Sequence, residues 1–480
     1  MINFVCVLII VILSAWFLFF YKPNASKTLC AARWMLLTWI LLLLIHIVSP
    51  VSYHSFTLSS STLIYSFVWI TSFCLGDKLG YYLKTNTLLV KRSKTRLSNP
   101  KTINIISILS VIGMAGLCFM RLGSMDLNLT TILYDLREVE TAGSDTGLFK
   151  TVFTFLACGG LVSFSMSLSS AFLMNKKISR LSLLGLISYL SVSFLAAGRS
   201  AVILGGLSLF VASIASYQLS LSRNIKLKMI VLKFSLVAVL AMAYIISVVS
   251  TRTTSWVGTM DRKIDVINKL SASTLDDNFR ESLRPLGTFG DTIIEIFYYL
   301  SPQLYGLEHG FNTYDGSFGL GAVQLPQITR QIEKILGLDI LEIIYKADKY
   351  SFEQYGLAAN FFRTAIHTTF LDFNLIFSIP YIFICGFIAG KLRKNAVMNK
   401  APYDIAVQAL ICAGAAFTII VSPSTEQAWT FPIIMFILLR ISSQYIYPIV
   451  LLASYSHSCH RRILIEDSKS IPYKVKENIS

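Results

Sequence analysis

The sequence predicts an all-α, polytopic membrane protein with about eleven transmembrane helices. Of its 480 residues, 54% are hydrophobic and only 14% are charged, and the mean hydropathy is +0.63. Soluble globular proteins carry roughly 25% charged residues, so this chain has too little polar surface to be one. Runs of about 20 apolar residues, each long enough to cross the hydrocarbon core of a bilayer, recur along its whole length.

The apolar segments define the predicted spans in order. The first has no basic start and no small-residue cleavage site before Lys22, so we expect it to be retained as a helix. Arg440 falls inside the last span and Pro448 follows it, so a twelve-span count stays open. The spans are expected at residues 2–21, 34–48, 58–75, 103–120, 148–173, 181–197, 201–219, 229–249, 368–389 and 405–421, and from 429 onward.

The connections between these spans alternate between basic and poorly charged. The net charge of +16 follows from this pattern, because Lys and Arg concentrate in cytoplasmic connections, and no nucleic-acid partner is expected. The alternation places the N-terminus outside and the C-terminus in the cytoplasm. It divides the chain into spans one to eight (1–250), a large extracytoplasmic loop (251–365), spans nine to eleven (366–456) and a cytoplasmic tail (457–480).

The loop at 251–365 separates the eighth and ninth spans. Loops of this length without function are uncommon. Within it, residues 331–346 place Ile332, Ile335 and Ile343 on one helical face and Glu333 on another. This pattern predicts an amphipathic helix that lies on the membrane surface. Such a helix would suit a lipid-borne substrate, and mere shielding of the spans below is the alternative.

Arginines on the predicted outer face are candidates for binding an anionic group. Arg199 lies in the turn between the sixth and seventh spans, Arg363 precedes the ninth, Arg137 lies in the loop after the fourth, and Arg280 and Arg284 would share one face of a short helix. The planar guanidinium binds phosphate oxygens in a bidentate manner. The alternatives are snorkelling toward lipid headgroups, pairing with neighbouring acids, and a solvated helix face.

A general base has several candidates on the same face. These are His367, Asp372 and Glu426, with His309 and Asp315 in the loop. Imidazole and carboxylate groups are the usual proton acceptors in catalysis, although a single histidine is more often structural. The eight cysteines lie in or beside the spans. No metal-ligand spacing, phosphate-binding loop or nucleotide-sugar motif is present, so we expect neither a metal nor a cofactor.

Four short motifs on the predicted outer face resemble those of a bacterial enzyme family. They are Tyr134-Asp135-Leu136-Arg137, Ala197-Gly198-Arg199-Ser200, Gly310-Phe311-Asn312-Thr313-Tyr314 leading to Leu325-Pro326, and Thr369-Phe370-Leu371-Asp372-Phe373. With many spans and one large late outer loop, the chain resembles the oligosaccharide repeat-unit polymerases, the Wzy-type polymerases of O-antigen and capsule. The family tends to have glycine where Asn374 stands, and arginine directly after proline where this chain has Gln327 with Arg330 later.

The resemblance implies a metal-independent glycosyltransferase in the bacterial inner membrane. A chain held on undecaprenyl diphosphate would move onto a lipid-linked repeat unit at the outer face, beside a flippase and a chain-length regulator. Arg199, Arg363 and one of Arg280 or Arg284 would bind the diphosphate, where positive charge favours departure of an anionic leaving group. The alternatives are an O-antigen ligase of similar architecture and a lipid-linked oligosaccharide flippase, which would place charges in the middle of several spans.

Overall fold

The computed structural model describes the chain in segments, and every structural statement below refers to these segments. They are residues 2–19, 25–53, 58–83, 99–122, 147–195, 200–220, 261–262, 264–265, 268, 273–313, 318–341 and 364–443.

Most of the described chain is helical, which agrees with the predicted class. Five described helices are long and apolar enough to cross a membrane. The count of eleven spans stays a prediction, since the eighth, at 229–249, lies outside the described residues. Helices occupy the other predicted spans, namely α1 (Ile2–Phe19), α3 (Ala31–Val48), α4 (Ser60–Tyr82), α6 (Pro100–Leu122), α8 (Leu148–Met174), α9 (Arg180–Leu195), α10 (Ser200–Leu219), α18 (Ala365–Asn399), α19 (Pro402–Phe417) and α20 (Gln427–Ile441).

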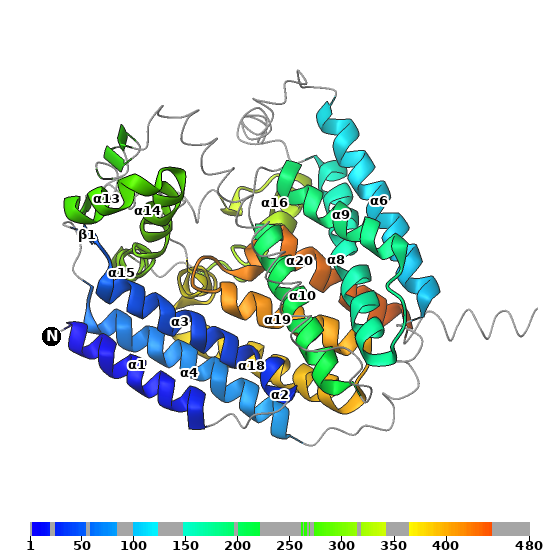
Figure 1. Cartoon of the computed structure of the whole chain (residues 1–480), viewed down its shortest axis with the longest axis horizontal. Coiled ribbons are helices and arrows are strands. Elements are labelled where there is room, and N and C mark those ends of the chain that lie inside the picture. The colour runs from blue at the N-terminus through cyan, green and yellow to red at the C-terminus, as the bar shows by residue number, and fades with distance from the viewer. Residues whose placement is uncertain are drawn as a thin grey trace, which may run out of the picture.

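The long apolar helices pack around two apolar cores that share their central members, and Figure 1 shows how these helices are arranged. One core is built around α1, α3, α4 and α18, and the other around α8, α9 and α20. Helices α10 and α19 give one face to each core. Helix α19 is buried along nearly its whole length, which suits a helix surrounded by others. Arg440, inside the last predicted span, lies 3.9 Å from the buried Asp404 of α19.

Helices α4 and α18 pack backbone against backbone through glycines. Gly76 and Gly80 on α4 face Gly386 and Gly390 on α18, and a Cβ on Gly390 would lie 1.9 Å from the carbonyl oxygen of Asp77. Small residues at a spacing of four allow such close approach in membranes. Gly76 meets Phe383 while Gly80 meets Phe387, so the two helices run parallel.

The long loop adds short helices and one strand. Strand β2 (Ser273–Leu275) pairs in antiparallel register with β1 (Val51–Tyr53) of the link between α3 and α4. This two-stranded ladder is a departure from the all-α expectation among the described residues. The other elements are α2 (Ala25–Thr28), α13 (Asp277–Leu283), η1 (Arg284–Leu286), α14 (Thr288–Leu300), α15 (Gln303–Thr313), α16 (Pro326–Leu336) and η2 (Pro423–Thr425).

The amphipathic helix lies five residues earlier than predicted. Helix α16 begins at Pro326, whose missing N–H costs nothing in the first turn. It ends at Gly337, whose φ of 66° places it in the left-handed region that commonly terminates helices. The prediction of a single helix over residues 331–346 is therefore wrong, because the helix ends at Gly337 within that range.

Candidate functional site

The described segments of the long loop are fixed to chain segments that the sequence predicts on the outer face. Strand β2 pairs with β1 in the link after α3, and α15 bonds the residue that precedes α4. Helix α16 bonds the first turn of α8 and the turn η2 before α20. The loop is thus held at one end of the helices, where most candidate site residues are also expected.

Gln324, just before α16, joins α18 to the turn at η2. Its side-chain nitrogen donates to Thr369 Oγ1 at 3.2 Å, and its side-chain oxygen accepts from Ser422 Oγ at 2.7 Å and from Ser424. Its backbone N–H donates to Asp372 at 2.7 Å. We call Gln324, Thr369, Asp372, Ser422 and Ser424 the Gln324 network. Its members are buried or half-buried, so the bonds are shielded from competition by water.

Asp372, a candidate general base, anchors the loop. One carboxylate oxygen accepts from the backbone of Val323 at 2.9 Å and the other from that of Gln324. The carbonyls of Leu371 and Asp372 accept from Gly319 and Leu320 at 3.1 and 3.0 Å. The side chain and the backbone carbonyls at this position thus both hold the segment that leads into α16. The role of Asp372 as a base stays a prediction.

A break in α18 explains why these carbonyls are available to the loop. Asn374 has φ 53° and ψ 178°, a conformation that is essentially restricted to glycine. Its side-chain oxygen accepts from the N–H groups of Ile376 and Phe377 at 2.9 and 3.0 Å, which caps the second half of the helix. The last carbonyls of the first half lack helical donors and take loop N–H groups instead.

His367, another candidate base, is buried in the first turn of α18. Its ring stacks on Phe370, with centroids 4.9 Å apart. The backbone of Gly310 on α15 covers the ring so closely that a Cβ there would lie 2.6 Å from Nε2. Only glycine fits this approach without a shift. His309 on α15 is buried as well, and Asp315 lies outside the described residues.

Glu308 on α15 is a buried carboxylate that sequence reasoning missed. It accepts from the backbone N–H and hydroxyl of Ser59 at 2.9 and 2.7 Å, and from Asn312 at 2.9 Å. Burial would raise the pKa of Glu308, but hydrogen bonds from Thr62, Ser59 and Asn312 outweigh it and hold the pKa below its usual value. Ser59 caps α4, so Glu308 acts as the acid of a capping box from a distant helix, and no local pattern reveals it.

Glu426, the third candidate base, lies between η2 and α20. Burial raises its pKa, while a hydrogen bond from Ser200 works in the opposite direction. Ser200 is the first residue of α10 and directly follows Arg199 in the chain. The contact therefore ties the carboxylate to the residue next to the leading arginine candidate.

The candidate arginines fall into two groups. Arg280 lies on α13, where it is paired with Asp261, and Arg284 follows in η1, where it is exposed. Helix α13 packs beside β1 and β2 (Figure 1), whereas Gln324 bonds Thr369 of α18 and Ser424 of η2. Arg137, Arg199 and Arg363 lie outside the described residues. The residue after Arg363, Thr364, is buried and caps α18.

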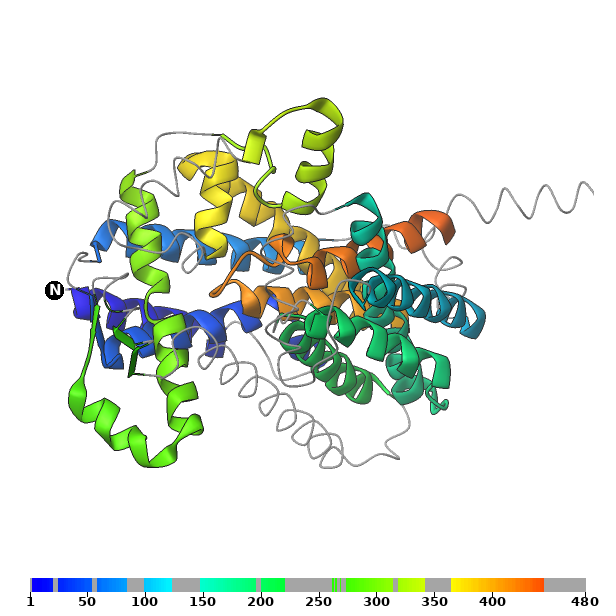
Figure 2. The same ribbon diagram turned by 90° about the horizontal axis from the view of Figure 1, so that it is seen from above.

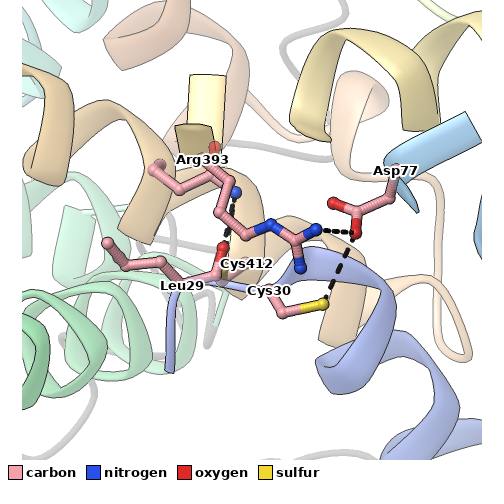
Figure 3. Close-up of polar contacts among 6 residues, drawn as sticks. Leu29, Cys30, Asp77, Arg393 and Cys412 are labelled. Carbon is pink, nitrogen blue, oxygen red and sulfur yellow. Dashed lines mark hydrogen bonds and ion pairs between the residues drawn. The ribbon is translucent and has the colours of Figure 1, made fainter. Parts of the chain in front are cut away.

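A second polar cluster lies at the opposite end of α4 and α18 (Figure 3). The Arg393 guanidinium lies 3.0 Å from the Asp77 carboxylate, and the Cys30 thiol donates to the same carboxylate at 3.5 Å. Arg393 also lies over the ring of Tyr81, 4.3 Å from its centroid. The sequence pattern assigned both charges to cytoplasmic connections. Gly76, next to Asp77, and Gly390, three residues before Arg393, are the sequence features that could have indicated a helix contact here.

Comparison of the chain with protein-family models, curated proteins and solved structures finds no match. Within the described segments, no three His, Cys, Asp or Glu side chains gather as a metal site.

Proposed function

We propose that the protein polymerises lipid-linked oligosaccharide repeat units at the outer face of a bacterial inner membrane. The supporting observation is that sequence motifs far apart in the chain meet in space. Gly310 of one motif covers His367, which lies two residues before another. Gln324, next to Leu325-Pro326, bonds Thr369 and Asp372 of the latter motif.

The predicted grouping of span ends on two opposite sides is supported by which segments touch. Helices α4 and α18 are the third and ninth predicted spans, which would cross the membrane in the same direction. Their parallel packing agrees with this order. Connections and span ends predicted on the cytoplasmic side also meet each other. Lys394 donates to the carbonyl of Leu83 at 2.7 Å, and Thr28 donates to Gln218 at 2.8 Å. An arrangement with the long loop at one end of the helices and these connections at the other end accounts for both sets of contacts.

In the proposed reaction, a hydroxyl of the lipid-linked repeat unit attacks the anomeric carbon of the donor chain. A new glycosidic bond forms, the bond from that carbon to the diphosphate oxygen breaks, and undecaprenyl diphosphate leaves with the electron pair. Arg199 and Arg363 would stabilise the charge that develops on the diphosphate. Each charge-assisted hydrogen bond contributes about 1.5–3 kcal/mol.

Glu426 is the candidate base that the geometry favours for the acceptor proton. The Asp372 oxygens accept loop N–H groups, and the His367 ring is covered by Gly310. Glu426 is half-buried beside Ser200. Its raised pKa brings its proton affinity closer to that needed by a base working near neutral pH.

Surface polysaccharide on a gel tests the proposal. A deletion strain would be complemented with wild type, Arg199→Ala, Arg199→Lys or Arg180→Ala at equal membrane levels. We expect single repeat units from the deletion strain and from Arg199→Ala, and a full ladder from wild type. Arg180, an exposed arginine at the predicted cytoplasmic end of α9, serves as the matched control and should restore the ladder.

Two other results would decide against the proposal. Long chains that accumulate on undecaprenyl diphosphate in the deletion strain would identify an O-antigen ligase, which uses the same donor with a different acceptor. A ladder that is unchanged by the deletion would overturn glycosyl transfer and favour the flippase alternative.

A further inference from the structure

Helix α16 exposes a row of large aliphatic side chains. Ile328, Ile332 and Ile335 fall within about 60° of one another around the helix axis, and Ile335 is 81% exposed. Arg330 and Lys334 lie on the opposite side of the helix, and both are exposed. A contiguous apolar row of this kind on an exposed helix marks a surface that contacts something other than water.

Polar contacts fix the direction in which this row points. Gln331 donates to Thr151 in the first turn of α8 at 3.2 Å, and Gln327 donates to the carbonyl of Thr425. The Thr329 hydroxyl donates to the carbonyl of Ala322 at 3.0 Å. The helix therefore rests on the protein through its glutamine and threonine side chains, which leaves the isoleucines on an outward edge.

A second exposed apolar group lies where the segment that leads into α16 meets α18. Phe318, ahead of α16, lies edge-on to Phe373 and Phe377, with centroids 6.4 and 6.3 Å apart. Phe377 and Ile376, just past the break at Asn374, are 58% and 77% exposed. Helix α18 is itself apolar enough to cross a membrane. Figure 2 shows α16, in yellow-green, at the periphery of the molecule.

The contacts also set the depth of α16 relative to the spans. Thr151 is the fourth residue of α8, and Thr425 lies in the turn just before α20. Both belong to span ends, so α16 lies at the level where hydrocarbon meets headgroups. An apolar face with cationic residues opposite it is the pattern of a helix that lies in the plane of this boundary.

We propose that α16 is an interfacial helix, with its isoleucine face among the acyl chains of outer-leaflet phospholipids and Arg330 and Lys334 directed away from the hydrocarbon. The apolar surface of α16 and that of α18 then form one lipid-facing wall, joined at Phe318. This proposal depends on the membrane location of the chain and not on the transfer reaction. Its test therefore reads lipid contact directly.

Spin-label accessibility tests the contact in the full-length protein. Ile335→Cys, Lys334→Cys and Ser282→Cys would each be labelled with a nitroxide in phosphatidylethanolamine–phosphatidylglycerol nanodiscs, with unmodified protein as the labelling background. All three positions are exposed, so the substitutions leave the packed interior unchanged. Collision with oxygen, which partitions into lipid, would be compared with collision with a water-soluble nickel chelate.

We expect the ratio of oxygen to nickel accessibility at residue 335 to exceed the ratios at 334 and 282 by several-fold. Two results would overturn the proposal. Equal ratios at all three positions would place the helix in water. Low accessibility of residue 335 to both reagents would mean that protein, such as a second copy of the chain, covers this face.

Discussion

The backbone N–H of Gln324 lies 2.7 Å from a carboxylate oxygen of Asp372, and this bond fixes the long loop to the first half of α18. Asp372 is buried, and its second oxygen accepts from Val323. The same segment of loop supplies N–H groups to the two carbonyls exposed by the break at Asn374. A long-range anchor and a local helix break therefore act together to hold the loop in place.

Asp372→Asn should loosen this anchor. One carboxylate oxygen becomes an NH2 group that faces a backbone donor, and a buried donor without a partner costs about 1–3 kcal/mol. We expect trypsin to cleave the loop at Arg330 and Lys334 several-fold faster in nanodiscs. Asp339→Asn, an exposed change in the same loop, is the control. Equal cleavage rates for the two variants would contradict the anchoring role.

Glu308 should make docking of the loop sensitive to acid. Its folded pKa is lowered, so its contribution to stability is complete above the unfolded pKa of about 4.3 and disappears as the pH falls through the folded value. We expect the thermal unfolding midpoint of the wild type to fall between pH 6 and pH 3. The unfolding midpoint of Glu308→Gln should be lower than that of the wild type at pH 6 and should fall less between pH 6 and pH 3.

The control for this pH dependence is Glu281→Gln, an exposed change on α13. It should keep the full dependence of the wild type. If Glu308→Gln showed the wild-type dependence as well, the bond to Ser59 would not be the origin of the effect.

The glycine contact between α4 and α18 should tolerate no side chain. A Cβ on Gly390 meets the Asp77 carbonyl oxygen, whereas a Cβ on Gly206 of α10 has nothing within 4 Å. Gly390→Ala should lower the unfolding midpoint in detergent, because backbone must move. Gly206→Ala should be neutral or stabilising by up to about 1 kcal/mol, from helix propensity. Equal stability of the two variants would mean that the helices do not touch at Gly390.

Asp77 and Arg393 should be energetically coupled. Removing one partner of a buried ion pair leaves an uncompensated charge and costs about 3–5 kcal/mol. Asp77→Asn and Arg393→Gln should each destabilise the protein strongly, and the double variant should be more stable than the sum of the two losses implies. A double-mutant cycle on unfolding free energies measures this. Additive losses would show that the pair contributes nothing as a pair.

The positions of the spans were predictable because each depends on a local run of apolar residues. The charge of the connections predicts the side on which each of them lies, and this assignment stays a prediction. The Gln324 network was not predictable, because Gln324 meets Ser422 across 98 positions and Glu308 meets Ser59 across 249. The glycine pairs at 76/80 and 386/390 were visible as patterns, but a pattern does not name its partner.

Asn374 shows how a departure from a resembling family becomes intelligible in the structure. The family tends to have glycine at this position, and the backbone here has the positive φ that glycine adopts freely. The asparagine side chain adds what glycine lacks, a cap to the N–H groups of Ile376 and Phe377. The sequence shows that asparagine replaces the usual glycine at this position. The structure shows that its side chain caps the second half of α18.

The measurement that tests the central claim most directly is chain growth by the purified protein. Protein in nanodiscs would be mixed with the lipid-linked repeat unit extracted from the deletion strain, and products would be resolved by gel and mass spectrometry. We predict a series of chains that differ by one repeat unit, with one undecaprenyl diphosphate released per bond, and loss of the series in Arg199→Ala. A repeat unit left unchanged by folded wild-type protein would contradict the account.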